Sequence, residues 1–240
     1  MKKLIIASTS TVHGSGYLEY LLPTLKVFFA GIDEILFVPY ARPSGMTHDE
    51  YTDVARKGFA KINIKVKGIH KSIDPIKSVK NAKAIFVGGG NTFLLVKTLY
   101  DNNLIPVIKE VVKNGTPYFG TSAGSNITGK TMQTTNDMPI VFPPSYSTLD
   151  LVPFNINPHY IDPDPESTHK GETRETRIVE YLVCNQIPVL GLREGSWLEI
   201  FGESIVLKGK LPARLFRQGE ELVELISDYN LQAEFKTDKP

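Results

Sequence analysis

The sequence predicts an α/β fold in which helices cover both faces of a parallel sheet. Short apolar runs alternate with longer amphipathic segments through the first half, and glycine or proline bounds most of the runs. A length of 240 residues suits one sizeable domain and is too short for two large ones. We therefore expect a single α/β domain over residues 1–231, followed by a polar C-terminal tail over residues 232–240.

Five runs in the first half have the β-branched and aromatic composition of buried strands, at residues 4–8, 34–40, 64–69, 84–87 and 117–120. The segments between them carry apolar residues at helical intervals. These predicted helices cover residues 17–29, 49–61, 73–79 and 92–114, the last divided in two near Asn102 and Pro106. Such alternation is typical of parallel sheets, whose ligands bind beyond the carboxyl ends of the strands.

The second half begins with a segment of different composition. Residues 131–168 are rich in Pro, Asn, Asp, Tyr and Thr and show little periodicity, so we expect loops and short strands over the end of the sheet. A helix at 173–186, a strand at 188–192 and a hairpin at 196–210 that turns at Gly202 are expected to follow.

Charge and cysteine content argue against several classes of protein. The net charge is +1 and the basic residues are scattered, so we expect neither nucleic acid nor a membrane as a partner. The apolar run at 4–7 is too short for a signal peptide, and no run is long enough to span a bilayer. A single cysteine cannot form an internal disulfide, which favours a cytoplasmic location, and the helical spacing around Cys184 predicts a packed core thiol.

A nucleophile motif follows the fifth predicted strand. The segment GTSAG at 120–124 matches the G-x-S-x-G pattern, in which a sharp turn between a strand and a helix presents a serine at the end of the sheet. The neighbours of such a serine must be small, because the turn is strained and crowded. We interpret Ser122 as a candidate nucleophile; the alternative is a glycine-rich turn with an incidental serine.

An activated serine also needs donors for the oxyanion. Gly88, Gly89, Gly90 and Asn91 follow the fourth predicted strand, and a loop without bulky side chains can present backbone N–H groups. We expect the N–H groups of Gly90 and Ala123 to form the oxyanion site. A phosphate-binding loop is the alternative, but the nucleotide-binding motifs do not match.

The base is sought among five histidines. His159 follows a strand-like run and a proline, which places an imidazole at the sheet end, and we favour it over His169. The orienting acid is either Asp137 or Glu194, since both follow expected sheet ends. No metal-binding pattern competes with this interpretation, so we expect no metal at the site.

The motifs that carry these residues resemble, in order along the chain, those of the peptidase E family of serine peptidases, the aspartyl dipeptidases. They are FVGGGNT (86–92), GTSAGSN (120–126), TTNDMP (134–139), NPHY (157–160) and GETRETRI (171–178). The likeness runs from about Leu4 to beyond Gly195. It implies a three-layer fold like that of class I glutamine amidotransferases, and hydrolysis of dipeptides with an N-terminal aspartate without a metal or another cofactor.

Carried over to this chain, the resemblance implies Ser122 as the nucleophile and His159 as the base. The family's acid matches Asp137 in one assignment and Glu194 in another, and we favour Asp137. An arginine is the natural partner of an aspartyl carboxylate, and we favour Arg174 over Arg177 for that role. The expected partner is a small acidic dipeptide, bound by a monomer or a homodimer.

Two other functions fit the same motifs. One is a cyanophycinase-like hydrolase of aspartate-arginine polymer, which shares the fold and the serine. The other is a module without catalytic activity that binds an anion at residues 88–91. The short chain without additional segments for a polymer favours the small substrate, and the presence of Ser122, His159 and both candidate acids favours an enzyme.

Overall fold

The computed structural model describes residues 1–168 and 170–235. Its strands are β1 (Lys3–Ala7), β2 (Glu34–Val38), β3 (Lys65–Gly68), β4 (Ile85–Val87), β5 (Tyr118–Thr121), β6 (Asn155–Pro158), β7 (Val189–Leu192), β8 (Ser196–Phe201), β9 (Ser204–Gly209), β10 (Ala213–Phe216) and β11 (Val223–Leu225). Its helices are α1 (Leu22–Phe28), α2 (His48–Ala60), α3 (Pro75–Lys80), α4 (Thr92–Asp101), α5 (Leu104–Lys113), α6 (Ala123–Asn126), α7 (Arg174–Cys184) and α8 (Gln232–Phe235), with 3-10 turns η1 (Glu19–Leu21) and η2 (Ile69–Lys71).

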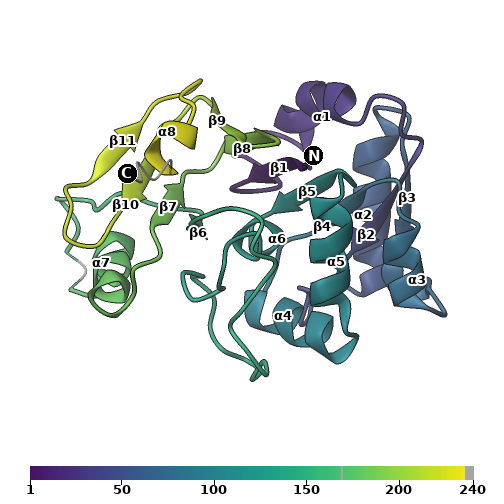
Figure 1. Cartoon of the computed structure of the whole chain (residues 1–240), viewed down its shortest axis with the longest axis horizontal. Helices are drawn as coiled ribbons and strands as arrows, with labels where there is room; N and C mark the ends of the chain where they lie inside the picture. Colours follow the sequence, from purple (N-terminus) through teal and green to yellow (C-terminus); the bar gives the residue numbers. More distant parts are fainter. Residues whose placement is uncertain (169, 236–240) are drawn as a thin grey trace, which may run out of the picture.

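The strands form two sheets (Figure 1). The larger has the order β3-β2-β4-β5-β1-β8-β9, and the smaller has the order β11-β10-β7-β6. Neighbouring strands from β3 to β1 in the larger sheet are parallel, as predicted from the alternation of strands and helices. The predicted hairpin is also present, since β8 pairs antiparallel with β9 and adds both strands to the edge beside β1.

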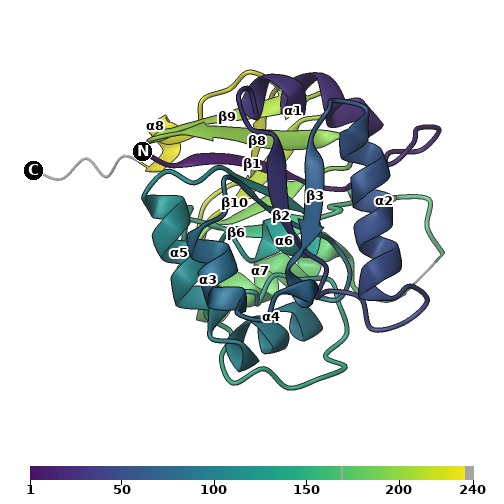
Figure 2. The ribbon, with the colours of Figure 1, turned by 90° about the vertical axis from the view of Figure 1, so that its right-hand side faces the viewer.

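Helices cover both faces of the parallel part, so the predicted α/β fold is confirmed. Along β1, Ile5 and Ala7 pack in the core that contains α1 and α2, whereas Leu4 and Ile6 pack in the core that contains α4 and α5. Figure 2 shows α2 and α5 on opposite sides of β2 and β3. Burial on both faces is why β1 is a continuous apolar run rather than an alternating one.

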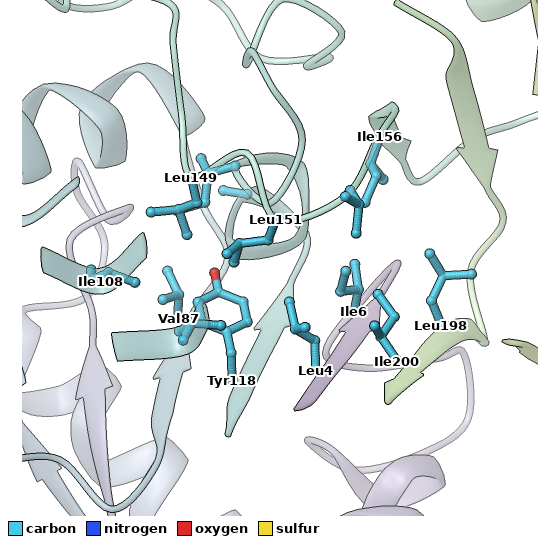
Figure 3. Packing of buried hydrophobic residues seen from close by; sticks show 14 of the residues in the cluster. Leu4, Ile6, Val87, Ile108, Tyr118, Leu149, Leu151, Ile156, Leu198 and Ile200 are labelled. Atoms are coloured by element: carbon cyan, nitrogen blue, oxygen red, sulfur yellow. The ribbon is translucent and has the colours of Figure 1, made fainter. Parts of the chain in front are cut away.

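The segment between α6 and β6 lies over the sheet as loops, as its composition predicted. Figure 3 shows Leu149 and Leu151 of this segment above Tyr118 of β5, with Ile156 of β6 beside them. All four side chains are almost fully buried in one core cluster. The loops therefore join the smaller sheet to the larger one through apolar packing.

The expectations for the C-terminal tail and for Cys184 differ from the structure. Residues 232–235 of the expected tail form α8, and the ring of Phe235 lies 4.9 Å from that of Phe154; residues 236–240 are outside the described part. Cys184 is exposed, not packed in the core. Cys184 lies two residues after the buried Leu182 in α7. Because a helix rotates by more than half a turn over two residues, the Cys184 side chain faces away from the core.

Within the described residues, no helix combines the length and the apolar character needed to cross a membrane.

The aromatic stack under the sheet provides a test of this core. Phe119 is fully buried and its ring stacks on that of Phe86 at 4.6 Å. Phe119→Ala is expected to lower the free energy of unfolding by about 3–5 kcal/mol, because it removes apolar contacts and leaves a cavity. Urea denaturation measures the change, with Phe142→Ala as the control, since Phe142 is 83% exposed. Equal effects of the two substitutions would contradict the packing described here.

Candidate active site

Ser122 occupies the turn between β5 and α6. Its backbone has φ 54° and ψ −113°, a conformation that L residues seldom adopt, and its N–H donates to the carbonyl of Ala7 at 3.2 Å. The sharp strand–serine–helix turn predicted from the sequence is therefore present. A non-glycine residue held in this region is strained, and such strain persists only where the surroundings fix it.

The glycines on either side of Ser122 are required by close backbone contacts. A Cβ atom on Gly120 would lie 2.5 Å from the carbonyl oxygen of Gly124. A Cβ atom on Gly124 would lie 2.1 Å from the carbonyl oxygen of Val87 in β4. Both separations are shorter than any normal contact, so the G-x-S-x-G pattern is explained by packing of α6 against β4 and β5.

His159 and Glu194 meet Ser122 from the smaller sheet. His159 follows β6 and Glu194 follows β7, two parallel strands whose carboxyl ends lie side by side at Pro158 and Leu192. The imidazole Nε2 lies 2.9 Å from Ser122 Oγ, and Nδ1 lies 2.6 Å from Glu194 Oε1. The three side chains thus form a continuous chain of hydrogen bonds.

The direction of these hydrogen bonds follows from the chemistry of the groups. An ionised carboxylate only accepts, so Nδ1 of His159 donates to Glu194. The neutral imidazole then has its lone pair on Nε2, which accepts from the hydroxyl of Ser122. This is the tautomer that a general base for serine requires.

Asp137 makes different contacts, so the sequence-based preference for Asp137 as the partner of His159 is revised in favour of Glu194. Asp137 Oδ2 accepts from Thr92 N at 2.7 Å, from Thr92 Oγ1 at 2.6 Å and from Thr135 Oγ1 at 3.0 Å. Thr92 begins α4, where a carboxylate is stabilised by the N-terminal N–H groups. These donors hold the carboxylate at the helix end.

The glycine loop lies against the serine, and only part of it has free N–H groups. A Cβ atom on Gly89 would lie 2.8 Å from Ser122 Cβ. Gly89 N donates to Tyr51 at 2.9 Å and Asn91 N donates to Ala41 at 2.7 Å. For Gly90 N and Ala123 N, no acceptor is found among the described residues.

Asn91 has a structural role in this loop. It is the N-cap of α4, where its side chain accepts from Leu94 N at 3.0 Å, and its Nδ2 donates to the carbonyl of Met138 at 2.9 Å. Asn91 therefore joins the glycine loop to the segment that carries Asp137. The sequence-based interpretation included Asn91 in the site, and the structure places it in the surrounding framework.

A cavity of about 270 Å³ opens at the serine. Its lining combines the nucleophile motif with residues from the loops and α7, namely Thr92, Ser122, Thr135, Asn136, Asp137, Pro158, His159 and Arg174. The guanidinium of Arg174 reaches the carbonyl of Pro158 at 3.4 Å, and burial lowers its pKa from the ordinary value, with Glu194 and Asp137 acting in the opposite direction. Arg177 is exposed and lies 3.8 Å from Glu172, so of the two arginines only Arg174 lines the cavity.

Sequence reasoning missed three supports of the site. Tyr51, buried in α2, accepts the N–H of Gly89. Ser8, at the end of β1, contacts the segments of both His159 and Glu194. Arg193 forms two hydrogen bonds to Asp162. The signal for Ser8 was its place at the carboxyl end of the strand predicted at residues 4–8, the end near which ligands of parallel sheets bind.

The Arg193–Asp162 ion pair connects the segments that carry His159 and Glu194. Asp162 lies three residues after His159, and Arg193 directly precedes Glu194. Arg193 Nε lies 2.8 Å from Asp162 Oδ2 and Nη2 lies 2.5 Å from Oδ1, and the guanidinium also contacts Glu224 at 2.9 and 3.0 Å. The Arg193 side chain is only 9% exposed. Hydrogen bonding to Arg193 lowers the pKa of Asp162 below its ordinary value.

No group of three or more His, Cys, Asp or Glu side chains that could hold a metal ion is found in the described part of the chain.

The lowered pKa of Asp162 predicts a pH-dependent contribution to stability. A carboxyl with a depressed folded-state pKa stabilises the fold above its unfolded pKa of about 3.9, and the contribution is lost as the pH falls through the folded value. Asp162→Asn is therefore expected to lower the Tm at pH 7, with the difference from wild type shrinking below about pH 4. Thermal unfolding from pH 7 to pH 3 measures this.

Asp53→Asn is the matched control, because Asp53 pairs with Arg56 on the exposed surface of α2 and surface pairs contribute little. A difference between Asp162→Asn and wild type that stays constant over the whole pH range would contradict the assigned ion pair.

Comparison with known proteins places this site in a family. Residues 4–208 match the model of peptidase family S51. "Peptidase E" of Streptomyces coelicolor is 51% identical over 222 residues, covering 92% of this chain and 90% of the relative. "Probable alpha-aspartyl dipeptidase" of Drosophila melanogaster is 45% identical over 230 residues, covering 93% of this chain and 95% of the relative.

Solved structures share the fold. A putative peptidase E protein from Listeria monocytogenes superposes with a TM-score of 0.66 at 24% identity, covering 87% of this chain and 98% of that chain. A peptidase from an acI-B1 actinobacterium superposes with a TM-score of 0.72 at 17% identity, covering 96% of each chain. The family match over most of the chain, together with the identities to the curated relatives, shows that this chain belongs to peptidase family S51.

Proposed function

We propose that this protein is a serine-type dipeptidase that hydrolyses dipeptides with an N-terminal aspartate, with Ser122 as the nucleophile. The observation that carries the proposal is the hydrogen-bonded chain from Ser122 through His159 to Glu194 at the mouth of a small cavity. The names of the relatives, peptidase E and alpha-aspartyl dipeptidase, support the same substrate class.

The reaction begins when Ser122 Oγ attacks the carbonyl carbon of the aspartyl residue while His159 Nε2 takes the hydroxyl proton. Glu194 holds the imidazole and stabilises its positive charge. The N–H groups of Gly90 and Ala123 donate to the oxyanion of the tetrahedral intermediate, a role supported by their lack of other acceptors in the described residues. His159 then protonates the departing amine, and water attacks the acyl-enzyme with His159 again as the base.

Arg174 and Asp137, the two remaining charged groups of the cavity, account for the proposed preference for a substrate with an N-terminal aspartate and a free amino group. Arg174 presents a guanidinium, which binds the β-carboxylate of the substrate through charge-assisted hydrogen bonds. Asp137 uses Oδ2 for its contacts with Thr92 and Thr135, and Oδ1 has no hydrogen-bond partner among the described residues. Oδ1 is thus available to accept from the α-ammonium group of the substrate.

We also propose a cytoplasmic location and a monomeric or homodimeric state. The free thiol of Cys184 supports a reducing compartment. Cell fractionation and light scattering on the purified protein measure these two properties.

The substrate class is tested by the hydrolysis of four compounds. Asp-Leu is expected to be cleaved, whereas Glu-Leu, Ala-Leu and N-acetyl-Asp-Leu are expected to be poor substrates, because each lacks the matching carboxylate position or the free ammonium group. Chromatography of released leucine measures the rates, and Ser122→Ala is the control, with turnover lower by several orders of magnitude. Faster cleavage of aspartate-arginine polymer than of Asp-Leu would overturn the dipeptidase assignment.

The two acids are expected to differ in which kinetic constant they affect. Glu194→Gln is expected to lower kcat by roughly 10²–10⁴-fold, since the imidazole loses its orienting charge. Asp137→Asn is expected to raise KM for Asp-Leu by about ten- to a hundred-fold, as a charge-assisted hydrogen bond to the ammonium is worth about 1.5–3 kcal/mol. Steady-state kinetics on the two variants measure both constants. A lower kcat for Asp137→Asn together with a higher KM for Glu194→Gln would exchange the roles of the two acids.

A further inference from the structure

A buried serine outside the proposed catalytic chain connects the two segments that carry its base and its acid. Ser8 directly follows β1 and is fully buried. Its hydroxyl donates to the carbonyl of Leu192 at 2.7 Å and accepts the backbone N–H of His159 at 2.9 Å. One hydroxyl group therefore spans the carboxyl ends of β6 and β7.

Both of these contacts lie close to the reacting groups. The N–H that Ser8 accepts belongs to His159 itself, whose backbone is in the left-handed region with φ 53°. The carbonyl to which Ser8 donates belongs to Leu192, two residues before Glu194, and this carbonyl also accepts from Tyr160 N at 3.1 Å. The orientation of the imidazole relative to the carboxylate thus depends on a bridge between main-chain groups.

The residue before Ser8 contacts the nucleophile turn. The carbonyl of Ala7 accepts Ser122 N at 3.2 Å and Ser125 Oγ at 2.6 Å. Ala7 thus contacts the turn that carries Ser122 in the larger sheet, and the next residue, Ser8, contacts the segments of the smaller sheet that carry the histidine and the acid. These two consecutive residues therefore connect the three side chains of the proposed catalytic chain. Within the part of the chain that the structure describes, no strand of one sheet pairs with a strand of the other, so the contacts at this end of β1 provide a fixed connection between the sheets.

We propose that Ser8 is a positioning residue that sets the geometry of His159 relative to Ser122 and Glu194 through the main chain. This inference rests on the proposed function. The Arg193–Asp162 ion pair and the pairing of β6 with β7 hold the same segments together without Ser8. Loss of the hydroxyl is therefore expected to leave the fold in place and to displace the imidazole by a small distance.

The test compares Ser8→Ala with two other variants. Ser8→Thr keeps a hydroxyl group at the position. Thr148→Val is the matched control, because Thr148 is also buried and its hydroxyl donates to the carbonyl of Gly129 at 2.8 Å, with no contact to Ser122, His159 or Glu194 among the described residues. For each variant, kcat and KM for Asp-Leu, the rate at which a fluorophosphonate labels Ser122, and Tm are measured.

Ser8→Ala is expected to lower kcat and the labelling rate by roughly ten- to a hundred-fold, since a small misplacement of a catalytic group has effects of this size. Its KM is expected to stay within about twofold of wild type, because Arg174 and Asp137 lie on other segments. Its Tm is expected to resemble that of Thr148→Val, and Ser8→Thr is expected to recover most of kcat.

Two results would overturn the inference. One is a Ser8→Ala protein whose kcat and labelling rate stay within about twofold of wild type. The other is a fall in kcat with a parallel rise in KM and a Tm far below that of Thr148→Val, which indicates general loosening. Should Ser8→Ala not fold, Ser8→Cys replaces it, because a thiol fills the space but is a weak donor and acceptor.

The labelling experiment also separates this inference from the proposed function. A wild-type Ser122 that the fluorophosphonate labels, together with an equal rate in Ser8→Ala, rejects only the role of Ser8. A folded wild-type protein whose Ser122 is not labelled rejects the proposed nucleophile, and the role of Ser8 with it.

Discussion

The turn at Ser122 has to fit between β4, β5 and β1, and the rest of the site depends on this close packing. The residue has a positive φ that L residues seldom adopt, and a Cβ atom on the flanking Gly120 or Gly124 would meet backbone atoms of neighbouring segments. A turn held this tightly fixes the backbone that carries the serine hydroxyl. The groups that we propose to act on that hydroxyl, His159 and Glu194, must then be brought to it by other segments, because the turn itself is held in place.

The smaller sheet brings those groups to the serine. β6 and β7 are parallel neighbours, so the residues that follow them emerge at the same edge, and His159 and Glu194 are those residues. The sheet is packed on the larger one by apolar loop residues such as Leu149 and Leu151 (Figure 3). The Arg193–Asp162 ion pair and the Ser8 hydroxyl fix the same segments with directional contacts. Apolar packing thus brings the sheets together, and polar contacts set the distances between the three side chains of the proposed catalytic chain.

The large sheet could be predicted from the sequence because its strands are buried on both faces. β1 and β4 are short apolar runs, each followed by a helical segment with apolar residues at regular intervals, a pattern typical of parallel sheets covered by helices. The smaller sheet was less predictable, since β6 contains Asn155, Asn157 and Pro158, and β10 and β11 lie in a region without a recognised motif. The asparagines are buried because their side chains bond to the backbone of neighbouring segments, which local patterns do not reveal.

The candidate site shows the same division between local and distant information. Ser122 and the glycine loop were identified from local patterns, because a crowded turn restricts the residues on both sides of it. The acid was not, since Asp137 and Glu194 both follow sheet ends and only the three-dimensional arrangement shows which carboxylate meets the imidazole. The contacts of Ser8 could not be predicted from local patterns, because its two partners are 151 and 184 residues away in sequence.

The most direct test of the catalytic assignment is the detection of an acyl-enzyme on Ser122. Rapid mixing of the wild-type protein with the α-p-nitrophenyl ester of aspartate makes acylation fast, so the proposed mechanism predicts an initial burst of p-nitrophenol of about one equivalent per protein chain. Acid quench, proteolysis and mass spectrometry are then expected to locate an aspartyl group on the peptide that contains Ser122. Turnover without a burst, and with no aspartyl group on that peptide, would contradict the mechanism and indicate direct attack by water.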